Sequence, residues 1–590
     1  MEPIIGIDLG TTNSEVAFIM DGKSTVLMEN DNGIVPSCVG LGADGTMSVG
    51  TAARNQATLY PDKTVLSIKR LMGSQEKVAL GNDSYTPQEI SAFILKALKE
   101  RAQRITGQTI TKAVITTPAY FTDAQRQATR EAGEIAGLTV IRILNEPTAA
   151  ALAYESADAH ARTILVYDLG GGTFDVSIVR IEDGVVEVLS STGDNHLGGD
   201  DFDLEIENRL LEHIEKEYSI DLSEDTIARA RLRHAAEKAK IELSSAPYAA
   251  IEEDHIAKKD GMDVHLSYEL SRVDFQSMIE HHLQKTMDSV NKALKDAAML
   301  PSALDKIILV GGSTRIPRLS AMLEDSFGIF PNQEIDPDLC VAMGAAIQAG
   351  REMGLDSAGI LLDITPYTFG TSAIGELDGV MTETLFVPLI RRNTKLPAVK
   401  SEVFWTVFSG QERVQIEVYQ GEDRDAVNNI LIGTYRLDLS PHQPESSPVI
   451  LKYELDFNGI LKITAIEKNT GKQITGVIEN AFSEISQDTV SASKSKIDKV
   501  WESLDDLDLD LDLDTAIDDS DEKKQVPAET DDAFESLIAR ARATLENASA
   551  EDCEEIINLI EEIKTLAADK KLDEAQKSAQ ALEDILFYLE

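Results

Sequence analysis

The alternation of apolar and polar residues changes along the chain and divides most of it into three regions. Residues 1–354 alternate short apolar runs, which predict buried strands, with longer amphipathic stretches, which predict helices. In residues 363–482 short stretches place an apolar residue at every second position, which is typical of the strands of a β-sandwich. Residues 529–590 carry three amphipathic stretches that predict a small helical bundle.

Two short glycine turns lie between strand-like runs in the first region. Residues 8–13 read Asp-Leu-Gly-Thr-Thr-Asn, and residues 168–173 read Asp-Leu-Gly-Gly-Gly-Thr. Glycine allows a close approach to the backbone, and the N–H groups and threonine hydroxyls of such a turn can hold phosphate oxygens. The leading aspartate can hold Mg²⁺ through water. One such turn is usually only a hairpin, but two copies suggest two related lobes that close on one nucleotide.

A third glycine-rich segment adds to this prediction. Residues 307–310 are a continuous apolar run typical of a buried strand. Residues 311–317 (Gly-Gly-Ser-Thr-Arg-Ile-Pro) follow as a turn that leads into a helix. We expect this arrangement to cradle an adenosine and its phosphates.

Two other candidates are ambiguous from spacing alone. The helix predicted at 225–244 places Glu237, Lys240 and Ser244 on one face, and the simplest interpretation is a solvated charged face. Lys69 stands in a Lys-Arg pair, which is usually surface charge.

Composition excludes several classes of function. The 590-residue chain is 43% hydrophobic and carries a net charge of -47, which speaks against nucleic acid and against an anionic membrane surface as partners. Its three cysteines are far apart and predict neither a disulfide framework nor a zinc site. We read no signal peptide and no apolar run long enough to span a membrane, so a cytoplasmic protein is expected.

Together the three glycine segments resemble the two phosphate motifs and the adenosine motif of actin-like ATPases. More specifically, they resemble the seventy-kilodalton heat-shock chaperones of the DnaK type, and the resemblance runs nearly continuously to about residue 481. Other segments that carry it are residues 119–126, 145–151 and 196–203. The resemblance implies an α/β actin-like, two-lobed ATPase domain at 1–354, an interdomain linker at 355–362 and an all-β sandwich that binds peptides at 363–482.

The resemblance also implies which residues bind ATP or ADP and hydrolyse ATP. The expected catalytic residues are Lys69, Glu146, Asp168 and Thr173. Mg²⁺ is expected at Asp8, Asp168 and Asp175, with K⁺ as a further candidate ion. The nucleotide itself is expected to contact Gly10, Thr11, Thr12, Asn13, Gly170, Gly171, Gly172, Gly198, Gly199, Glu237, Lys240, Ser244, Gly311, Gly312, Ser313, Arg315 and Asp338.

By the same resemblance, a set of residues links the ATPase to the sandwich. The expected coupling residues are Pro118, Arg126, Arg142, Leu361, Leu362 and Asp363. The apolar residues 360–362 would dock on the ATPase when ATP is bound and leave it afterwards, although from pattern alone they could begin the next domain's first strand. The expected peptide-binding residues are Ile374, Val407 and Val414. Thr371 is more polar, and Trp405 bulkier, than the family pattern, which bears on peptide preference.

Two parts of the chain depart from the family. Residues 72–87 are fewer than the family spends on one surface subdomain, so we expect a trimmed surface with activity intact. After a lid-like helix at 483–504, residues 505–514 alternate aspartate with leucine, and the dense acids predict a disordered tether at 505–528. Capture of the alternating leucines by the peptide cleft, as an extended strand, is an open alternative. The bundle at 529–590 would be a reduced lid.

The sequence therefore predicts an ATP-dependent chaperone that couples ATP hydrolysis to binding and release of unfolded polypeptides. Its expected partners are unfolded clients, a J-domain co-chaperone and a GrpE-type nucleotide exchange factor, and the expected state is a monomer. The chain has no Glu-Glu-Val-Asp tail, which favours a bacterial-type protein. One alternative is a family ATPase dedicated to a single client, and another is a small-molecule kinase of the actin-like superfamily, which would have no use for residues 363–482.

Overall fold

The structure is a computed structural model that divides into two compact units, residues 1–509 and 510–590. Its described residues are 2–42, 45–154, 162–182, 184–332, 334–355, 360–440, 446–457, 459–478 and 487–511, together with 559 and 582. The predicted bundle at 529–590, apart from residues 559 and 582, and the tether beyond 511 lie outside the described residues, as do 356–359 of the linker and 483–486 of the lid-like helix.

The N-terminal sheet carries the first glycine turn. Its strand order is β11-β10-β1-β2-β3, and β4 pairs with β2. β1 and β2 form an antiparallel hairpin, and β10 and β11 add to β1 in parallel. The strands are β1 (Ile4–Leu9), β2 (Asn13–Met20), β3 (Lys23–Val26), β4 (Ile34–Pro36), β10 (Lys112–Thr117) and β11 (Thr139–Asn145).

A second sheet repeats this plan with the other two glycine segments. Its order is β17-β12-β13-β14-β18, in which β12 and β13 form an antiparallel hairpin and β17 pairs with β12 in parallel. The strands are β12 (Arg162–Leu169), β13 (Phe174–Glu182), β14 (Val185–Asp194), β17 (Lys306–Val310) and β18 (Ile360–Leu362). Both mixed sheets thus contain an antiparallel hairpin with a parallel strand beside its first strand, as expected for two related lobes.

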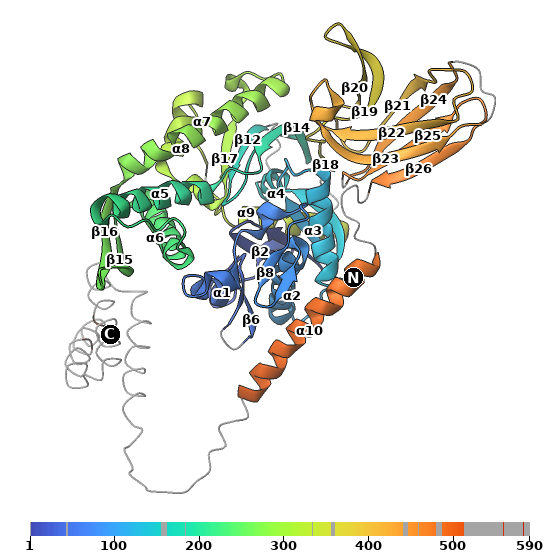
Figure 1. The fold of residues 1–590 in the computed structure, drawn as a ribbon. Helices are drawn as coiled ribbons and strands as arrows, with labels where there is room; N and C mark the ends of the chain where they lie inside the picture. Colours follow the sequence, from blue (N-terminus) through green and yellow to red (C-terminus); the bar gives the residue numbers. More distant parts are fainter. Residues whose placement is uncertain are drawn as a thin grey trace. The chain divides into compact units, whose positions relative to one another are not determined.

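Two small-residue helices pack against both sheets. Buried alanines of α4 (Glu146–Ala153) and α9 (Cys340–Glu352) share one apolar cluster with β1, β10, β12 and β17. The helices approach so closely that a Cβ on Gly344 of α9 would lie 1.7 Å from the carbonyl oxygen of Ala149. This close contact ties the two sheets to one core (Figure 1).

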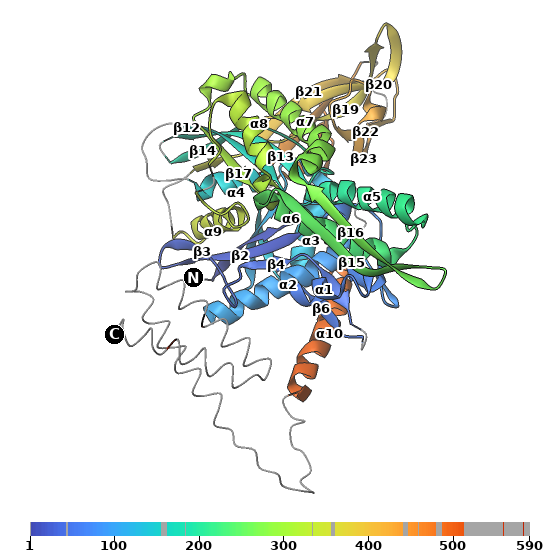
Figure 2. The same cartoon turned by 90° about the vertical axis from the view of Figure 1, so that its left-hand side faces the viewer.

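The remaining helices flank these sheets. The helix predicted at 225–244 is confirmed as α6 (Thr226–Ser245), which the Asp225 carboxylate caps. A capping box at Thr86 begins α2 (Pro87–Thr106). Figures 1 and 2 show α6 beside α5 and the β15–β16 hairpin. The other elements of this region are α1 (Thr51–Gln56), α3 (Asp123–Ile135), α5 (Gly199–Tyr218), α7 (Arg272–Asp296), α8 (Pro317–Phe327), β5 (Val39–Leu41), β6 (Met47–Val49), β7 (Thr64–Val65), β8 (Val78–Leu80), β9 (Asp83–Tyr85), β15 (Tyr248–Lys259) and β16 (Met262–Ser271).

The alternating region forms the predicted β-sandwich. Two four-stranded sheets, ordered β20-β19-β22-β23 and β21-β24-β25-β26, enclose one apolar core centred on Tyr453, Val418 and Leu461. The strands are β19 (Phe369–Leu377), β20 (Val380–Ile390), β21 (Ala398–Trp405), β22 (Arg413–Gln420), β23 (Ile430–Asp438), β24 (Pro448–Leu455), β25 (Leu461–Glu467) and β26 (Gln473–Ile478).

The three apolar linker residues do not begin the sandwich. They form β18, which pairs in parallel with β14 through Ile360 with Val185, Leu361 with Val186 and Leu362 with Glu187. The alternative that they start the next domain's first strand is therefore wrong, because their backbone extends the edge of the second sheet.

The predicted lid-like helix is α10 (Gln487–Leu511), which packs on α2. The Trp501 ring stacks on Phe93 with centroids 6.2 Å apart, and Lys96 Nζ lies 2.6 Å from Asp498 Oδ1. Residues 505–511 are helical, so the expectations that the disordered tether starts at 505 and that these leucines lie in an extended strand are wrong. Leucine is a strong helix former, which favours continuation of the helix through this segment. Within the described residues, no helix is long and apolar enough to cross a membrane.

Candidate functional site

The three glycine-rich segments meet around one cavity of about 350 Å³. The cavity lies between the hairpin turns of the two sheets and receives further side chains from α6 and from the loop before α9. Among the expected site residues, those that line it are Asp8, Gly10, Thr11, Thr12, Asn13, Lys69, Glu146, Asp168, Gly170, Gly171, Thr173, Glu237, Lys240, Ser244, Gly311, Gly312, Ser313, Arg315 and Asp338.

The glycines of these segments are needed because backbones approach each other closely. A Cβ on Gly10 would lie 1.9 Å from the carbonyl oxygen of Asn13, which closes the first turn. Gly311 has a φ of 81° and would meet the carbonyl oxygen of Leu169 at 2.5 Å, so it lets the third segment pack on the second. Ser313 Oγ donates to the carbonyl oxygen of Gly170 at 2.9 Å and holds the same two segments together.

Three expected glycines support the cavity without lining it. A Cβ on Gly198 would lie 2.5 Å from the backbone of Gly171, and a Cβ on Gly172 would lie 2.6 Å from Thr11 Cγ2. The N–H of Gly199 donates to the carbonyl oxygen of Gly170 at 3.0 Å. These contacts fix the second turn against the start of α5.

At the base of the cavity one lysine faces a group of buried carboxylates. Lys69 Nζ, in a side chain that is 4% exposed, lies 2.6 Å from Glu146 Oε1. Asp8 accepts a hydrogen bond of 2.6 Å from the hydroxyl of Thr116, and Asp168 ends β12 on the other side of the cavity. Thus β1, β12, α4 and the short turn 68–71 each deliver one charged group to one place.

The carboxylates outnumber the cation, and their pKa values reflect this. Desolvation raises the pKa of Glu146 to about 8, against the opposing effect of Lys69. Desolvation also raises the pKa of Asp168, to which the neighbouring Glu146 and Asp175 carboxylates add, and it raises the pKa of Asp8. The pKa of Lys69 is raised because the carboxylates outweigh its own desolvation.

This donor set fits Mg²⁺. Mg²⁺ is a hard cation that takes carboxylate and water oxygens and usually binds through one or two protein carboxylates and substrate phosphates. Asp8, Asp168 and Glu146 supply buried carboxylates with uncompensated charge beside the two phosphate turns. In addition, Thr12 Oγ1 is buried without a hydrogen-bond partner among the described residues, which suits an acceptor such as a phosphate oxygen.

Asp175, expected at the metal, lies beside the cavity rather than in its lining. Its carboxylate accepts the N–H groups of Ala119 at 2.9 Å and Tyr120 at 3.2 Å. Desolvation raises its pKa to about 6, although these two hydrogen bonds lower it. Asp175 thus connects the second sheet to the turn that follows β10.

At the opposite end of the cavity, charged side chains of α6 are already paired. Glu237 forms an ion pair with Arg54 of α1, which bridges the two sides of the cavity. Lys240 Nζ lies 2.8 Å from Asp203 and donates to the carbonyl oxygen of Gly199 at 3.1 Å. These pairings contradict the simplest interpretation of the face as solvated charge, because the side chains face the cavity and the neighbouring elements.

Arg315 and Asp338 form the remaining wall. Arg315 Nη2 lies 2.8 Å from Asp338 Oδ2 and 2.7 Å from Asp336 Oδ1. Ser244, one turn after Lys240 on α6, completes this end of the cavity. The wall combines a planar guanidinium with hydroxyl and carboxylate acceptors, which can recognise the ring and ribose of a nucleoside.

Three of the expected coupling residues, Pro118, Arg126 and Asp363, lie near Asn145, the residue before Glu146. Arg126 donates to Asn145 Oδ1 at 2.5 Å and to the carbonyl oxygen of Ala119 at 2.9 Å. Asn145 Nδ2 in turn donates to both carboxylate oxygens of Asp363 at 3.0 Å. Pro118 is buried nearby.

Two of the expected coupling positions lie on the linker strand, and another lies apart from that network. Leu361 of β18 is buried in the cluster shared by both sheets, and Leu362 is half-buried. Arg142 instead lies 3.6 Å from Glu352 at the end of α9.

The expected peptide-binding residues lie on three different segments of the sandwich. Ile374 on β19 is 51% exposed and Val407, after β21, is 57% exposed. Val414 on β22 is half-buried and packs against the sandwich core. Trp405, at the end of β21, is exposed too, so this part of the sandwich presents large apolar side chains to solvent.

Several residues at the site were not predicted. Glu15 on β2 lines the cavity and is 2% exposed, and desolvation raises its pKa well above the ordinary value. A charged residue beside the apolar run 16–19 is a signal that could have found it. Tyr367 donates its hydroxyl to the carbonyl oxygen of Tyr120 at 2.6 Å, a contact between distant segments that no local pattern reveals.

Comparison with known proteins gives one consistent result. The model of the family described as Hsp70 protein matches residues 4–588. The chain is 41% identical, over 99% of its length and 94% of the relative's, to "Chaperone protein DnaK" of Mycoplasmopsis synoviae (strain 53). It is 46% identical, over 81% of its length and 80% of the relative's, to "Chaperone protein DnaK" of Thermotoga neapolitana.

The carboxylate cluster predicts how stability depends on pH. The raised pKa values of Asp175 and Glu146 mean that folding favours their protonated forms, so this stabilisation is present at acidic pH and is lost as pH rises through about 6 and about 8. We expect the Tm in magnesium-free buffer to fall between about pH 5 and about pH 9. Glu146→Gln should reduce that fall by at least about 2 °C, since one pKa unit is worth about 1.4 kcal/mol.

The control for this measurement is Glu324→Gln, a change at an exposed position of α8. Thermal unfolding of the three proteins across the pH range checks the prediction. If Glu146→Gln and Glu324→Gln both keep the wild-type profile, the buried carboxylate does not titrate as described.

Proposed function

The chain belongs to the Hsp70 family of ATP-hydrolysing chaperones, and from that premise we propose how its residues use ATP and transmit the result to the sandwich. The observation that carries the proposal is the buried Lys69–Glu146 pair in the cavity where the three glycine segments meet. ATP binds there, between two actin-like lobes built on the two mixed sheets. Unfolded, extended apolar segments bind the sandwich.

For hydrolysis, we assign the base of the cavity to the phosphates. Thr11, Thr12 and the turn 170–173 hold phosphate oxygens, and Asp8 and Asp168 hold Mg²⁺, which neutralises charge on the phosphates when bound. Glu146 and Asp175 would contact the ion through water. Lys69 lies near the γ-phosphate and, with Glu146, orients the attacking water, so that positioning and electrostatics supply most of the rate acceleration. K⁺ is a further candidate ion at this end of the cavity.

The far end of the cavity is assigned to adenosine. Glu237, Lys240 and Ser244 of α6 form one wall, and Arg315 with Asp338 forms the other. Arg54 already pairs with Glu237 across the opening, so a nucleotide bound beneath this ion pair is partly enclosed. Enclosure excludes water other than the nucleophile and strengthens the interactions inside.

Coupling between the two domains runs through two hydrogen-bonded paths. In the first path, Asn145, the residue just before Glu146, donates to the carboxylate of Asp363, which follows the linker strand. In the second, Asp175 binds the N–H of Tyr120, whose carbonyl oxygen accepts the hydroxyl of Tyr367. A change at the phosphates that moves Glu146 or Asp175 therefore acts directly on residues that precede the sandwich.

Hydrolysis is proposed to release β18 from β14 and to free the sandwich to close on a client. Among the described residues, three residue pairs join β18 to β14, and Ile360 is exposed, which supports a docking that can reverse. Two states of similar free energy can then exchange, and the bound nucleotide selects between them.

Client binding is assigned to the exposed apolar residues of the sandwich. Val403 and Trp405 on β21, and Val407 and Phe408 after it, all have side chains more than about a third exposed. An extended peptide can add main-chain hydrogen bonds at a sheet edge while its side chains enter apolar pockets. We assign Ile374 and Val414 to the same surface.

Partners and location follow from the family premise. We propose unfolded polypeptides as clients, a J-domain co-chaperone whose contact includes Arg142, and a GrpE-type exchange factor. The cytoplasm is the proposed compartment, and the chain is proposed to act as a monomer.

The catalytic assignment predicts the effect of Lys69→Ala. We expect steady-state ATP hydrolysis to fall by about 100-fold or more, the typical cost of removing one group aimed at the reacting phosphate or its nucleophile. Wild-type turnover should be slow and should increase when an unfolded apolar peptide is added. Lys258→Ala is the matched control, because Lys258 is an exposed lysine on β15. Full activity in Lys69→Ala would refute the assignment.

The second coupling path predicts the effect of Tyr367→Phe. The substitution removes the hydroxyl that donates to Tyr120 and leaves the ring, whose centroid lies 4.7 Å from that of Tyr120, in place. A hydrogen bond contributes about 0.5–1.5 kcal/mol, so we expect the ratio of peptide-stimulated to basal hydrolysis to fall by about 2- to 10-fold. Tyr419→Phe, which removes a hydroxyl bonded to Glu417 within the sandwich, is the control. Equal ratios in wild type and Tyr367→Phe would rule out this path.

A further inference from the structure

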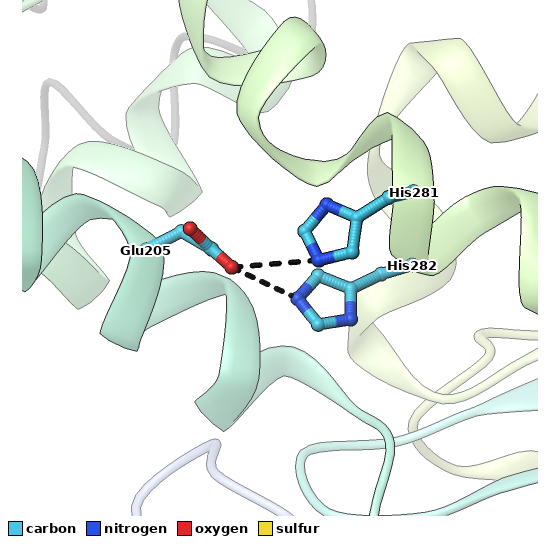
Figure 3. A group of neighbouring side chains, drawn as sticks. All are labelled: Glu205, His281 and His282. Atoms are coloured by element: carbon cyan, nitrogen blue, oxygen red, sulfur yellow. Dashed lines mark hydrogen bonds and ion pairs between the residues drawn. The ribbon is translucent and has the colours of Figure 1, made fainter.

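Two helices outside the nucleotide cavity bring a carboxylate and two imidazoles together. Glu205 projects from α5, and His281 and His282 project from α7 toward it (Figure 3). Glu205 Oε1 lies 3.2 Å from Nε2 of His282 and 3.6 Å from Nε2 of His281. The three potential ligand atoms all lie within 4.8 Å of one another.

The environment of His281 decides which nitrogen faces the carboxylate. Its Nδ1 lies 3.0 Å from the carbonyl oxygen of Met278, which can only accept a hydrogen bond. Nδ1 therefore carries the proton, and in the neutral ring Nε2 presents a lone pair toward Glu205. Two acceptors that face each other are bridged either by a proton or by a metal cation. A carbonyl bonded to the other ring nitrogen is also the usual outer-shell partner of a metal-bound histidine.

His282 is held in the same orientation by packing. Its ring lies between helices with the centroid 3.8 Å from that of His281 and 5.7 Å from that of Phe202. Its Nε2 points at Glu205, as the dashed line in Figure 3 shows.

These distances match a small tetrahedral site. With metal–nitrogen and metal–oxygen bonds of about 2.0–2.1 Å, neighbouring ligand atoms of a tetrahedron lie about 3.3 Å apart. The two measured separations from Glu205 Oε1, 3.2 and 3.6 Å, bracket that value. Imidazole nitrogen and carboxylate oxygen together suit Zn²⁺ and its neighbours in the first transition row rather than Mg²⁺.

We propose that Glu205, His281 and His282 bind one divalent transition-metal ion of the Zn²⁺ class, with water in the remaining position. The His281 side chain is 56% exposed and that of Glu205 is 33% exposed, so the ion and its water have access from solvent. The site is distinct from the Mg²⁺ position at the phosphates, which is built from carboxylates alone.

A bound ion would fasten α5 to α7. α5 begins at Gly199, whose N–H donates to Gly170 of the second phosphate turn, so the ion would stiffen the helix that supports that turn. We therefore expect the metal to raise the Tm of the full chain. This effect does not require ATP hydrolysis, so its failure and the failure of the proposed function are distinguishable.

The experiment uses the full chain stripped with a chelator and titrated with Zn²⁺ by calorimetry, and with Co²⁺ by absorption spectroscopy. We expect one ion per chain and a Co²⁺ spectrum of tetrahedral type without the charge-transfer absorption that cobalt–thiolate bonds give, which separates this site from the cysteines. His281→Ala and Glu205→Gln should each weaken binding by about 100-fold or more, since even outer-shell partners contribute about 10- to 100-fold. Both variants should lose the metal-dependent rise in Tm.

The matched control is the double variant His255→Ala with His265→Ala on the β15–β16 hairpin. These rings also lie close, 4.7 Å apart, but each pairs with its own aspartate, His255 with Asp263 and His265 with Asp254. The control should bind Zn²⁺ as the wild type does. The proposal is overturned if the wild type takes up no ion, if the Co²⁺ spectrum shows thiolate ligation, or if His281→Ala and Glu205→Gln bind as tightly as the control.

Discussion

The structure depends on one costly arrangement, the burial of Lys69 among the carboxylates of Asp8, Glu146 and Asp168. Removing charges from water costs several kcal/mol per ion, and one ammonium cannot neutralise so many carboxylates. Their raised pKa values record that imbalance. A protein tolerates such a cluster where binding needs it, and we propose that Mg²⁺, bound together with a nucleotide, supplies the missing positive charge. The glycine turns follow from the same need, because phosphates must approach the backbone within hydrogen-bonding distance.

This electrostatic arrangement extends to the sandwich through Asn145 and Asp175. Asn145 is next to Glu146 in the chain and binds Asp363. Asp175 is itself one of the buried carboxylates and binds the N–H of Tyr120. The contacts are few and individually worth about 0.5–1.5 kcal/mol. We propose that docking of the linker strand is reversible and that the nucleotide bound at the cluster selects the docked or the released state. A larger apolar interface at this position would hold one state permanently.

Local patterns in the sequence predict the parts of the fold that are themselves local. A few adjacent residues are enough to indicate the glycine turns at Gly10 and Gly311. The same holds for the amphipathic pattern of α2 and the alternating pattern of the sandwich strands. The resemblance to a family added the gathering of Lys69, Glu146 and Asp8. The end of α10 differs from the prediction, because the helix propensity of leucine and the repulsion between neighbouring acids favour opposite outcomes in residues 505–511.

Contacts between distant segments could not be predicted from the sequence. Glu15, the bridge from Arg54 to Glu237 and the bond from Tyr367 to Tyr120 depend on how sheets and helices are placed, which no short-range pattern encodes. The same is true of Glu205 with His281 and His282, where a spacing typical of a metal site exists only between helices. A search for polar residues beside apolar runs would have found Glu15 alone.

We propose that the charged cluster controls whether residues 360–362 pair with β14. Amide hydrogen exchange of this segment tests it most directly, because the N–H of Ile360 donates to the carbonyl oxygen of Gly184 at 3.0 Å when β18 is docked. The measurement would compare Lys69→Ala loaded with ATP and Mg²⁺, which should retain ATP, with the same protein loaded with ADP. We predict slow amide exchange of residues 360–362 with ATP and fast exchange with ADP. Equal exchange in the two nucleotide states would contradict it.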